Sequence, residues 1–251
     1  MRGSVPRALA AMVIVSGVAA ATWSAGRGDT AEAAVTETRV VLSDDFSGDR
    51  GGEPDGDVWT ATGSGGTARL DGEGRLALGS ALRTETIFEQ ESGHVEARIK
   101  GDRADGAWRA LGVLDASGRV PAGQPEILAS DQVDSGDFHT YAIDWTPTTL
   151  TWSLDGRQVL RFTPEQKGMP KIFVLNGAAG GQNSSGMLVD QVEITVQVPV
   201  DTSSAKQWKA FIAYKAGDLV KYRTVVYRVR EAHTSLPDWK PDLVPALFEK
   251  V

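Results

Sequence analysis

Aromatic side chains are concentrated near the C-terminus, in a number that suits sugar binding. Residues 206–251 contain seven of them. A module of this size has too small a core to bury so many large rings. Pyranose rings have apolar C–H faces that stack on aromatic planes, so exposed rings in this segment would form a carbohydrate-binding surface.

Trp239 is the leading candidate for such a ring because it lies between Pro237 and Pro241. Proline fixes the backbone φ angle, so this loop is rigid and would hold the indole outward. The alternative is that Trp239 packs in the core. We also predict sugar contacts from Tyr214 and Trp208, although Tyr214 could be half buried.

The surrounding residues predict a small all-β module that positions these rings. Residues 215–218 have the composition of a turn, 219–222 that of a strand and 225–229 that of its antiparallel partner. The polar segment 199–204 is predicted to be a linker, so the module occupies 205–251.

A longer β-region precedes the linker, and its clearest part is 137–162. Residues 138–145 alternate apolar and polar side chains, 150–154 do so again, and Asp155-Gly156 follows. Asp-Gly suits the positive φ angles of a tight hairpin turn. We therefore predict a three-stranded antiparallel meander.

The rest of 40–198 contains many short strand candidates separated by turn residues, and no amphipathic helix of ten residues or more. This pattern is typical of a β-sandwich or barrel, so the fold class is all-β. Trp59, Trp145 and Trp152 fall at strand positions, where core packing is favoured over sugar stacking.

Composition limits the other classes of function. The 251-residue chain has no cysteine and three widely spaced histidines, so we predict no metal site and no cofactor. Residues 35–204 contain 14 Lys and Arg against 26 Asp and Glu, whereas 205–251 contain 9 against 5. The acidic balance of the longer part argues against nucleic acid as a partner.

The N-terminus has the pattern of a secretory signal peptide. Arg2 and Arg7 precede an apolar run over 8–21, and Ala31-Glu32-Ala33 could serve as a cleavage site. The alternative is an uncleaved anchor, although the run is shorter than the roughly 20 residues that a spanning helix needs. We assign 1–33 to the signal peptide and expect a secreted, extracellular monomer without a membrane segment.

Six stretches of the long β-region, taken in order, resemble glycoside hydrolase family 16. They are DDFSG (44–48), SGHVEARIK (92–100), GAWRALGVLD (106–115), DFHTYAIDWTPTTLTWSLDGR (137–157), FVLNGAAGG (173–181) and MLVDQVEI (187–194). The resemblance implies a concanavalin-like antiparallel β-sandwich, or jelly roll. It also implies that Trp108 lies on the cleft side, where we predict that its ring contacts the sugar; the alternative is that Trp108 packs in the core.

The family's catalytic pattern, E-x-D-x-x-E, falls on residues 126–131 of this chain, and two of its three carboxylates are altered. Glu126 occupies the nucleophile position, Leu128 replaces the assisting Asp, and Asp131 occupies the acid/base position one methylene short. Retaining hydrolysis needs two carboxyl groups about 5–5.5 Å apart. Only five residues lie between this motif and Asp137. The family usually has several strands in this interval, and they build part of the cleft.

Residues 206–251 resemble the chitin-binding modules of carbohydrate-binding module families 5 and 12. The matching pieces are Trp208, AYKAGDLVKY (213–222), VVYRV (225–229) and AHTSLPDWKPDLVPALF (232–248). In this pattern Trp239 corresponds to the exposed binding tryptophan, and Phe248 replaces a usual Trp.

Three functions remain open on the sequence. The first is a polysaccharide-binding protein, with chitin or a β-glucan-like polymer as partner and a degenerate hydrolase sandwich. The second is an active retaining endo-β-glucanase that uses Glu126 and Asp131. The third is a structural cell-envelope protein whose sandwich contacts another protein.

Overall fold

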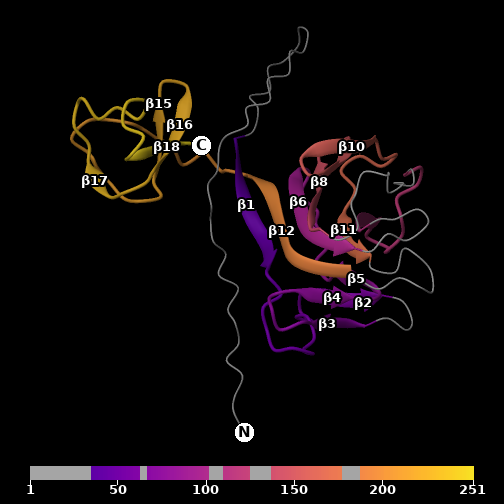
Figure 1. Cartoon of the computed structure of the whole chain (residues 1–251). Helices are drawn as coiled ribbons and strands as arrows, with labels where there is room; N and C mark the ends of the chain where they lie inside the picture. The colour runs from indigo at the N-terminus through magenta and orange to yellow at the C-terminus, as the bar shows by residue number, and fades with distance from the viewer. Residues whose placement is uncertain (1–34, 63–66, 102–109, 125–136, 177–186) are drawn as a thin grey trace. The chain divides into compact units, whose positions relative to one another are not determined.

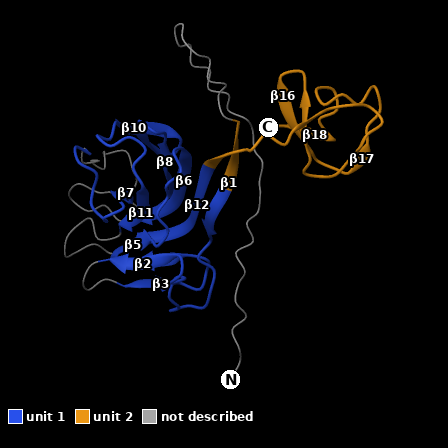
Figure 2. Cartoon of the chain, turned by 180° about the vertical axis from the view of Figure 1, so that it is seen from behind, with its two compact units in different colours: residues 1–13, 40–196 blue, residues 14–39, 197–251 orange. Residues whose placement is uncertain are grey.

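The computed structural model describes residues 35–62, 67–101, 110–124, 137–176 and 187–251. Every regular element in these residues is a β-strand, and the described residues fall into two compact units. The first unit covers 40–196, and the second covers 35–39 and 197–251 (Figure 2).

The first unit contains an eight-stranded antiparallel sheet in which β12 is the longest strand and curves along the sheet (Figure 1). The strand order is β10-β9-β8-β6-β12-β4-β3, and β1 also pairs with β12. The bounds are β1 Thr36–Asp44, β3 Ala68–Leu70, β4 Leu76–Leu78, β6 Gly93–Gly101, β8 His139–Trp145, β9 Leu150–Leu154, β10 Arg157–Phe162 and β12 Met187–Pro199.

A four-stranded antiparallel sheet completes this unit, in the order β2-β5-β11-β7. Its strands are β2 Trp59–Thr62, β5 Ala81–Thr84, β7 Leu111–Asp115 and β11 Lys171–Asn176. Two tryptophans join the sheets. The Trp145 ring of β8 lies 5.2 Å from the Phe173 ring of β11, and Trp152 of β9 donates to the carbonyl of Leu111 on β7 at 3.4 Å.

These contacts confirm the predicted antiparallel β-sandwich. The meander is confirmed strand by strand in β8, β9 and β10, with Asp155 at φ 49° and Gly156 at φ 76° in the connecting turn. Trp59, Trp145 and Trp152 are buried, as the alternation predicted. Alternation succeeds here because one face of each sheet must meet the other sheet.

The second unit contains two small sheets. The four-stranded sheet has the order β13-β15-β16-β18, and β14 pairs with β17 in a separate ladder. The bounds are β13 Lys206–Gln207, β14 Ala213–Tyr214, β15 Leu219–Tyr222, β16 Val225–Val229, β17 His233–Thr234 and β18 Phe248–Lys250. The predicted hairpin is confirmed in β15 and β16, with Arg223 in its turn at φ 57°.

Candidate carbohydrate-binding site

The loop around Trp239 holds a partly exposed indole ring on a hydrogen-bonded turn of the second unit. Trp239 is 37% exposed. Its backbone N–H donates to the carbonyl of Leu236 at 2.9 Å, and this bond closes a tight turn. Pro237 lies inside this turn, where its fixed φ favours the bend. The loop therefore holds the indole partly in solvent, as the flanking prolines predicted.

His233 supports Trp239 from the side of the core. The two rings have centroids 6.0 Å apart, and the other neighbours of His233 are Tyr214 at 6.1 Å and Phe248 at 5.1 Å. The Nδ1 of His233 lies 2.7 Å from the carbonyl of Glu231, so Nδ1 is the donor and the tautomer is fixed. This stack ties an exposed ring to buried ones.

Tyr214 is a core residue, which corrects its prediction as a sugar contact. It is 6% exposed and belongs to the buried cluster with Val220, Val229 and Phe248. Its hydroxyl accepts from the N–H of Lys209 at 2.9 Å and donates to the same residue's carbonyl at 3.2 Å. A ring whose faces are covered by protein has none free for a pyranose, so Tyr214 positions the site from below.

Trp208 is half-buried and packs against the same core cluster. It meets Tyr222 edge-on, with centroids 5.5 Å apart and planes at 86°. Its indole Nε1 is buried and has no hydrogen-bond partner among the described residues. Most of this ring therefore serves packing, and its contribution to a sugar surface stays a prediction.

Three exposed apolar residues of the second unit were not predicted from the sequence. Phe211 is 70% exposed, Ile212 44% and Leu236 42%. The exposure of Phe211 accompanies an unusual backbone conformation, with a positive φ of 63°. Such a value is a genuine outlier for a bulky residue, and nothing in the local sequence indicates it.

The predicted catalytic residues of the sandwich, Glu126 and Asp131, lie outside the described residues, as does Trp108. The four-stranded sheet of the sandwich is among the described residues. A row of paired residues crosses the face of that sheet turned away from the core, formed by Thr60, Arg83, Val174 and Gly112. All but Gly112 are half-buried, and the Nε of Arg83 has no hydrogen-bond partner among the described residues.

Two histidines of the sandwich have structural partners. His94 Nδ1 lies 2.8 Å from Asp144 Oδ1 on the neighbouring strand, and His139 Nδ1 lies 2.7 Å from Asp155 Oδ2 at the hairpin turn. The hydrogen bond that His94 donates to the Asp144 carboxylate raises the pKa of His94 against the opposing effect of burial. His94 thus links β6 to β8, and His139 links β8 to the β9–β10 turn.

Among the described residues, no group of three or more His, Asp or Glu side chains is arranged to hold a metal ion. The described part of the chain also has no helix long and apolar enough to cross a membrane.

Two family models match the chain. Residues 207–249 match the model described as carbohydrate-binding module family 5/12, and residues 116–179 match that of glycosyl hydrolases family 16. Both matches agree with the resemblances drawn from the sequence motifs.

Curated relatives match the second unit. Chitinase Chi52 of Paenibacillus xylanexedens is 50% identical over 48 residues, which are 19% of this chain and 9% of the chitinase. Streptogrisin-C of Streptomyces griseus is 46% identical over 44 residues, 18% of this chain and 10% of the relative. The matched region is thus about a tenth of each relative.

Solved structures match the sandwich. The endo-β-1,3-glucanase of Pyrococcus furiosus is 18% identical, with a TM-score of 0.49 over 66% of this chain and 97% of the glucanase. A pseudo β-1,3-glucanase of Mycobacterium tuberculosis is 20% identical, with a TM-score of 0.46 over 62% of this chain and 98% of that protein.

Proposed function

Because the chain joins a glycosyl hydrolases family 16 domain to a module of carbohydrate-binding family 5/12, we propose that it is a secreted polysaccharide-binding protein. The module holds chitin or a similar β-linked polymer. The sandwich binds a polysaccharide without hydrolysing it. Secretion follows from the signal-peptide pattern of residues 1–33 and from the location of chitin outside cells.

The observation that carries the proposal is the partly exposed indole of Trp239 on a turn backed by His233. A ring fixed in place loses little entropy when it stacks on a sugar, so its contact area adds directly to affinity. The matching region of Chitinase Chi52 belongs to a protein named for chitin. Chitin is therefore the first polymer to test.

Two sequence features support a sandwich that does not hydrolyse. Leu128 cannot supply the charge with which an assisting carboxylate separates the pKa values of its neighbours. Asp131 is one methylene shorter than Glu, and a displacement of about 1 Å can reduce a rate about 100-fold. The mature chain is expected to release no reducing ends above the blank from laminarin, lichenan, carrageenan, agarose or chitosan.

The test of binding is a pull-down on chitin beads with Trp239→Ala. Stacking and burial of an indole contribute about 1.5–3 kcal/mol, so we expect the apparent Kd to rise about 10-fold to 100-fold. Val159→Ala is the matched control, because Val159 is a 43% exposed apolar residue of the sandwich. Unchanged retention of Trp239→Ala would remove this indole from the site, and an equal loss in both variants would indicate nonspecific adsorption.

A further inference from the structure

Phe211 combines high exposure with an unfavourable backbone. It is the most exposed large apolar side chain in the described part of the chain, at 70%, and its φ is 63°. A left-handed conformation costs a bulky residue about 1–3 kcal/mol. Folding gains almost nothing in return from a ring that stays in solvent, so this position calls for an explanation other than packing.

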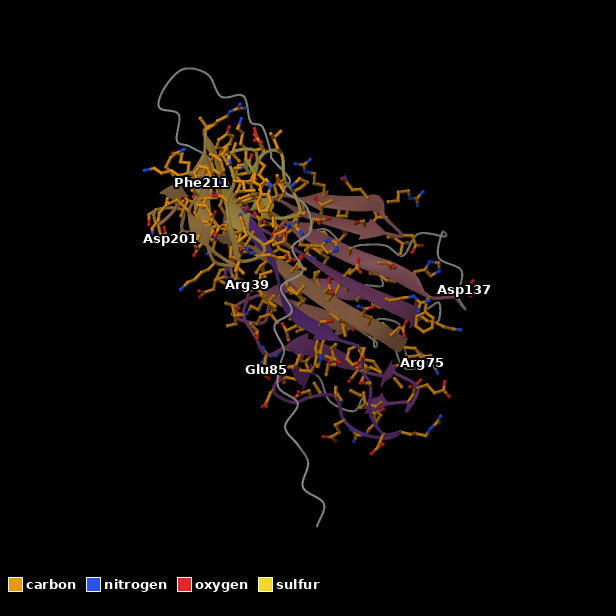
Figure 3. All side chains as sticks on the ribbon, turned by 90° about the vertical axis from the view of Figure 1, so that its left-hand side faces the viewer. Arg39, Arg75, Glu85, Asp137, Asp201 and Phe211 are labelled. Atoms are coloured by element: carbon orange, nitrogen blue, oxygen red, sulfur yellow. The ribbon has the colours of Figure 1, made fainter. Side chains whose placement is uncertain are left out.

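The backbone around Phe211 is held firmly. Its N–H donates to the carbonyl of Ser235 at 2.7 Å, and the N–H of Ser235 donates to the carbonyl of Ile212 at 3.0 Å. Ser235 is fully buried, and its hydroxyl donates to the carbonyl of Lys209 at 2.7 Å. These bonds continue the β14–β17 ladder beyond Ala213 and Thr234. The exposed ring therefore projects from an ordered backbone (Phe211 is labelled in Figure 3).

The same ladder leads from Phe211 to Trp239. Phe211 and Ile212 both bond to Ser235, as in a β-bulge whose first residue has a positive φ. Ser235 precedes Leu236, and the carbonyl of Leu236 accepts from the backbone N–H of Trp239. Phe211, Ile212, Leu236 and Trp239 are each at least 37% exposed. We call these four residues the apolar platform. Exposed large apolar residues that the backbone pairing gathers in this way mark a contact site.

The chemistry of the platform selects its occupant. Its four side chains carry no charge and no hydrogen-bonding group other than the indole N–H. Two rigid aromatic rings on a neutral surface suit the apolar faces of successive sugars in a polymer. An ionic ligand would find no counter-charge in these residues.

We propose that Phe211 is a second stacking residue, so that the module holds a β-linked polymer at two rings, Phe211 and Trp239. This inference rests on the proposed function, because it extends the surface around Trp239. Two points of contact raise retention on a repeating polymer surface beyond what either ring gives alone.

The experiment uses Phe211→Asn in the mature chain, with binding to chitin beads as the readout. Asn tolerates a positive φ better than most residues, so the variant removes the ring while relieving the backbone. We expect the apparent Kd to rise about tenfold, as for the loss of one aromatic contact, with no decrease in the Tm of the second unit. Phe211→Trp keeps a stacking plane and is expected to retain at least wild-type binding.

Arg223→Asn is the matched control. Arg223 also has a positive φ, at 57°, and it lies in the β15–β16 turn with a side chain that is 75% exposed. The Arg223→Asn variant relieves the same kind of backbone strain as Phe211→Asn but removes no apolar ring. Its binding to chitin should therefore equal that of the wild type.

The outcomes separate the two proposals. If Trp239→Ala loses binding while Phe211→Asn binds as the wild type does, the second ring is refuted and the proposed function stands. If the wild type itself does not bind chitin, both proposals are refuted for this polymer. Equal losses in Phe211→Asn and Arg223→Asn would also overturn the role of Phe211, because backbone change alone would then explain the effect.

Discussion

A buried lysine in the sandwich provides a sharp test of the structure through pH. Lys171 begins β11, is 2% exposed, and its Nζ donates to the carbonyl of Met169 at 2.7 Å and to that of Gln90 at 3.4 Å. The same Nζ lies 5.7 Å from the centre of the Trp145 ring. Burial lowers the pKa of Lys171 from 10.5 to about 8, against an opposing attraction from Glu91.

The direction of the pH effect follows from the lowered pKa. Between the folded value of about 8 and the unfolded value of 10.5, the unfolded chain holds a proton on Lys171 that the folded chain has released. The free energy of unfolding therefore rises with pH in this window, and the penalty is fully present below it. From pH 7 to pH 10 the shift is worth about 2.5 kcal/mol.

Lys171→Met removes this titration but leaves the two carbonyls without their donor. Each unsatisfied buried acceptor costs about 1–3 kcal/mol, so the variant should be close to the wild type in stability at pH 7. At pH 10 it should be less stable by about 2–3 kcal/mol, because the wild type has by then lost most of its penalty. The change of this difference with pH is the quantity to measure.

The assay is urea unfolding of the mature chain at several pH values from 7 to 10, with the transition of the sandwich followed by tryptophan fluorescence. The control is Lys167→Met, which makes the same substitution at an exposed lysine of the sandwich. The scan ends at pH 10 because burial raises the pKa of Tyr141, which favours unfolding at higher pH. If the difference in free energy of unfolding between Lys171→Met and the wild type stayed constant from pH 7 to pH 10, the lowered pKa of the buried Lys171 amine would be refuted.

Two further predictions concern the sandwich. Gly93→Ala should lower the free energy of unfolding by about 3 kcal/mol in the same urea assay, since overpacking is costly. Its Cβ would lie 2.3 Å from the Trp145 ring and 2.4 Å from the carbonyl oxygen of Thr195, and a loss below 1 kcal/mol would contradict the close packing. Glu126→Gln should leave the reducing-end signal at the wild-type level, whereas a rate that disappears in this variant would establish hydrolysis by Glu126.

The strand framework could be predicted from the sequence because its signals are local and repeated. In β8 and β9 the alternation of apolar residues, followed by Asp155-Gly156, determines the strands, their turn and their buried tryptophans. The same reasoning identified Trp239 through its flanking prolines. Each of these features depends on residues within a few positions of one another.

The binding surface was less predictable, because exposure there depends on contacts distant in sequence. The hydroxyl of Tyr214 makes two hydrogen bonds with the backbone of Lys209, and its ring packs against His233, which lies on another strand. Phe211 is exposed because its backbone is left-handed and bonded to Ser235. Composition indicated that some rings must be exposed, but it could not indicate which.

The core of the sandwich and its predicted chemistry are carried by different residues, so the loss of hydrolysis that we propose would leave the core contacts intact. The rings that join the two sheets, Trp145, Trp152 and Phe173, come from β8, β9 and β11. None of these strands includes residues 126–131. Leu128, which the resemblance places where the family has a carboxylate, therefore removes none of these contacts between the sheets. Selection for binding alone could then retain the fold and the platform of the second unit, whatever happens to the carboxylates.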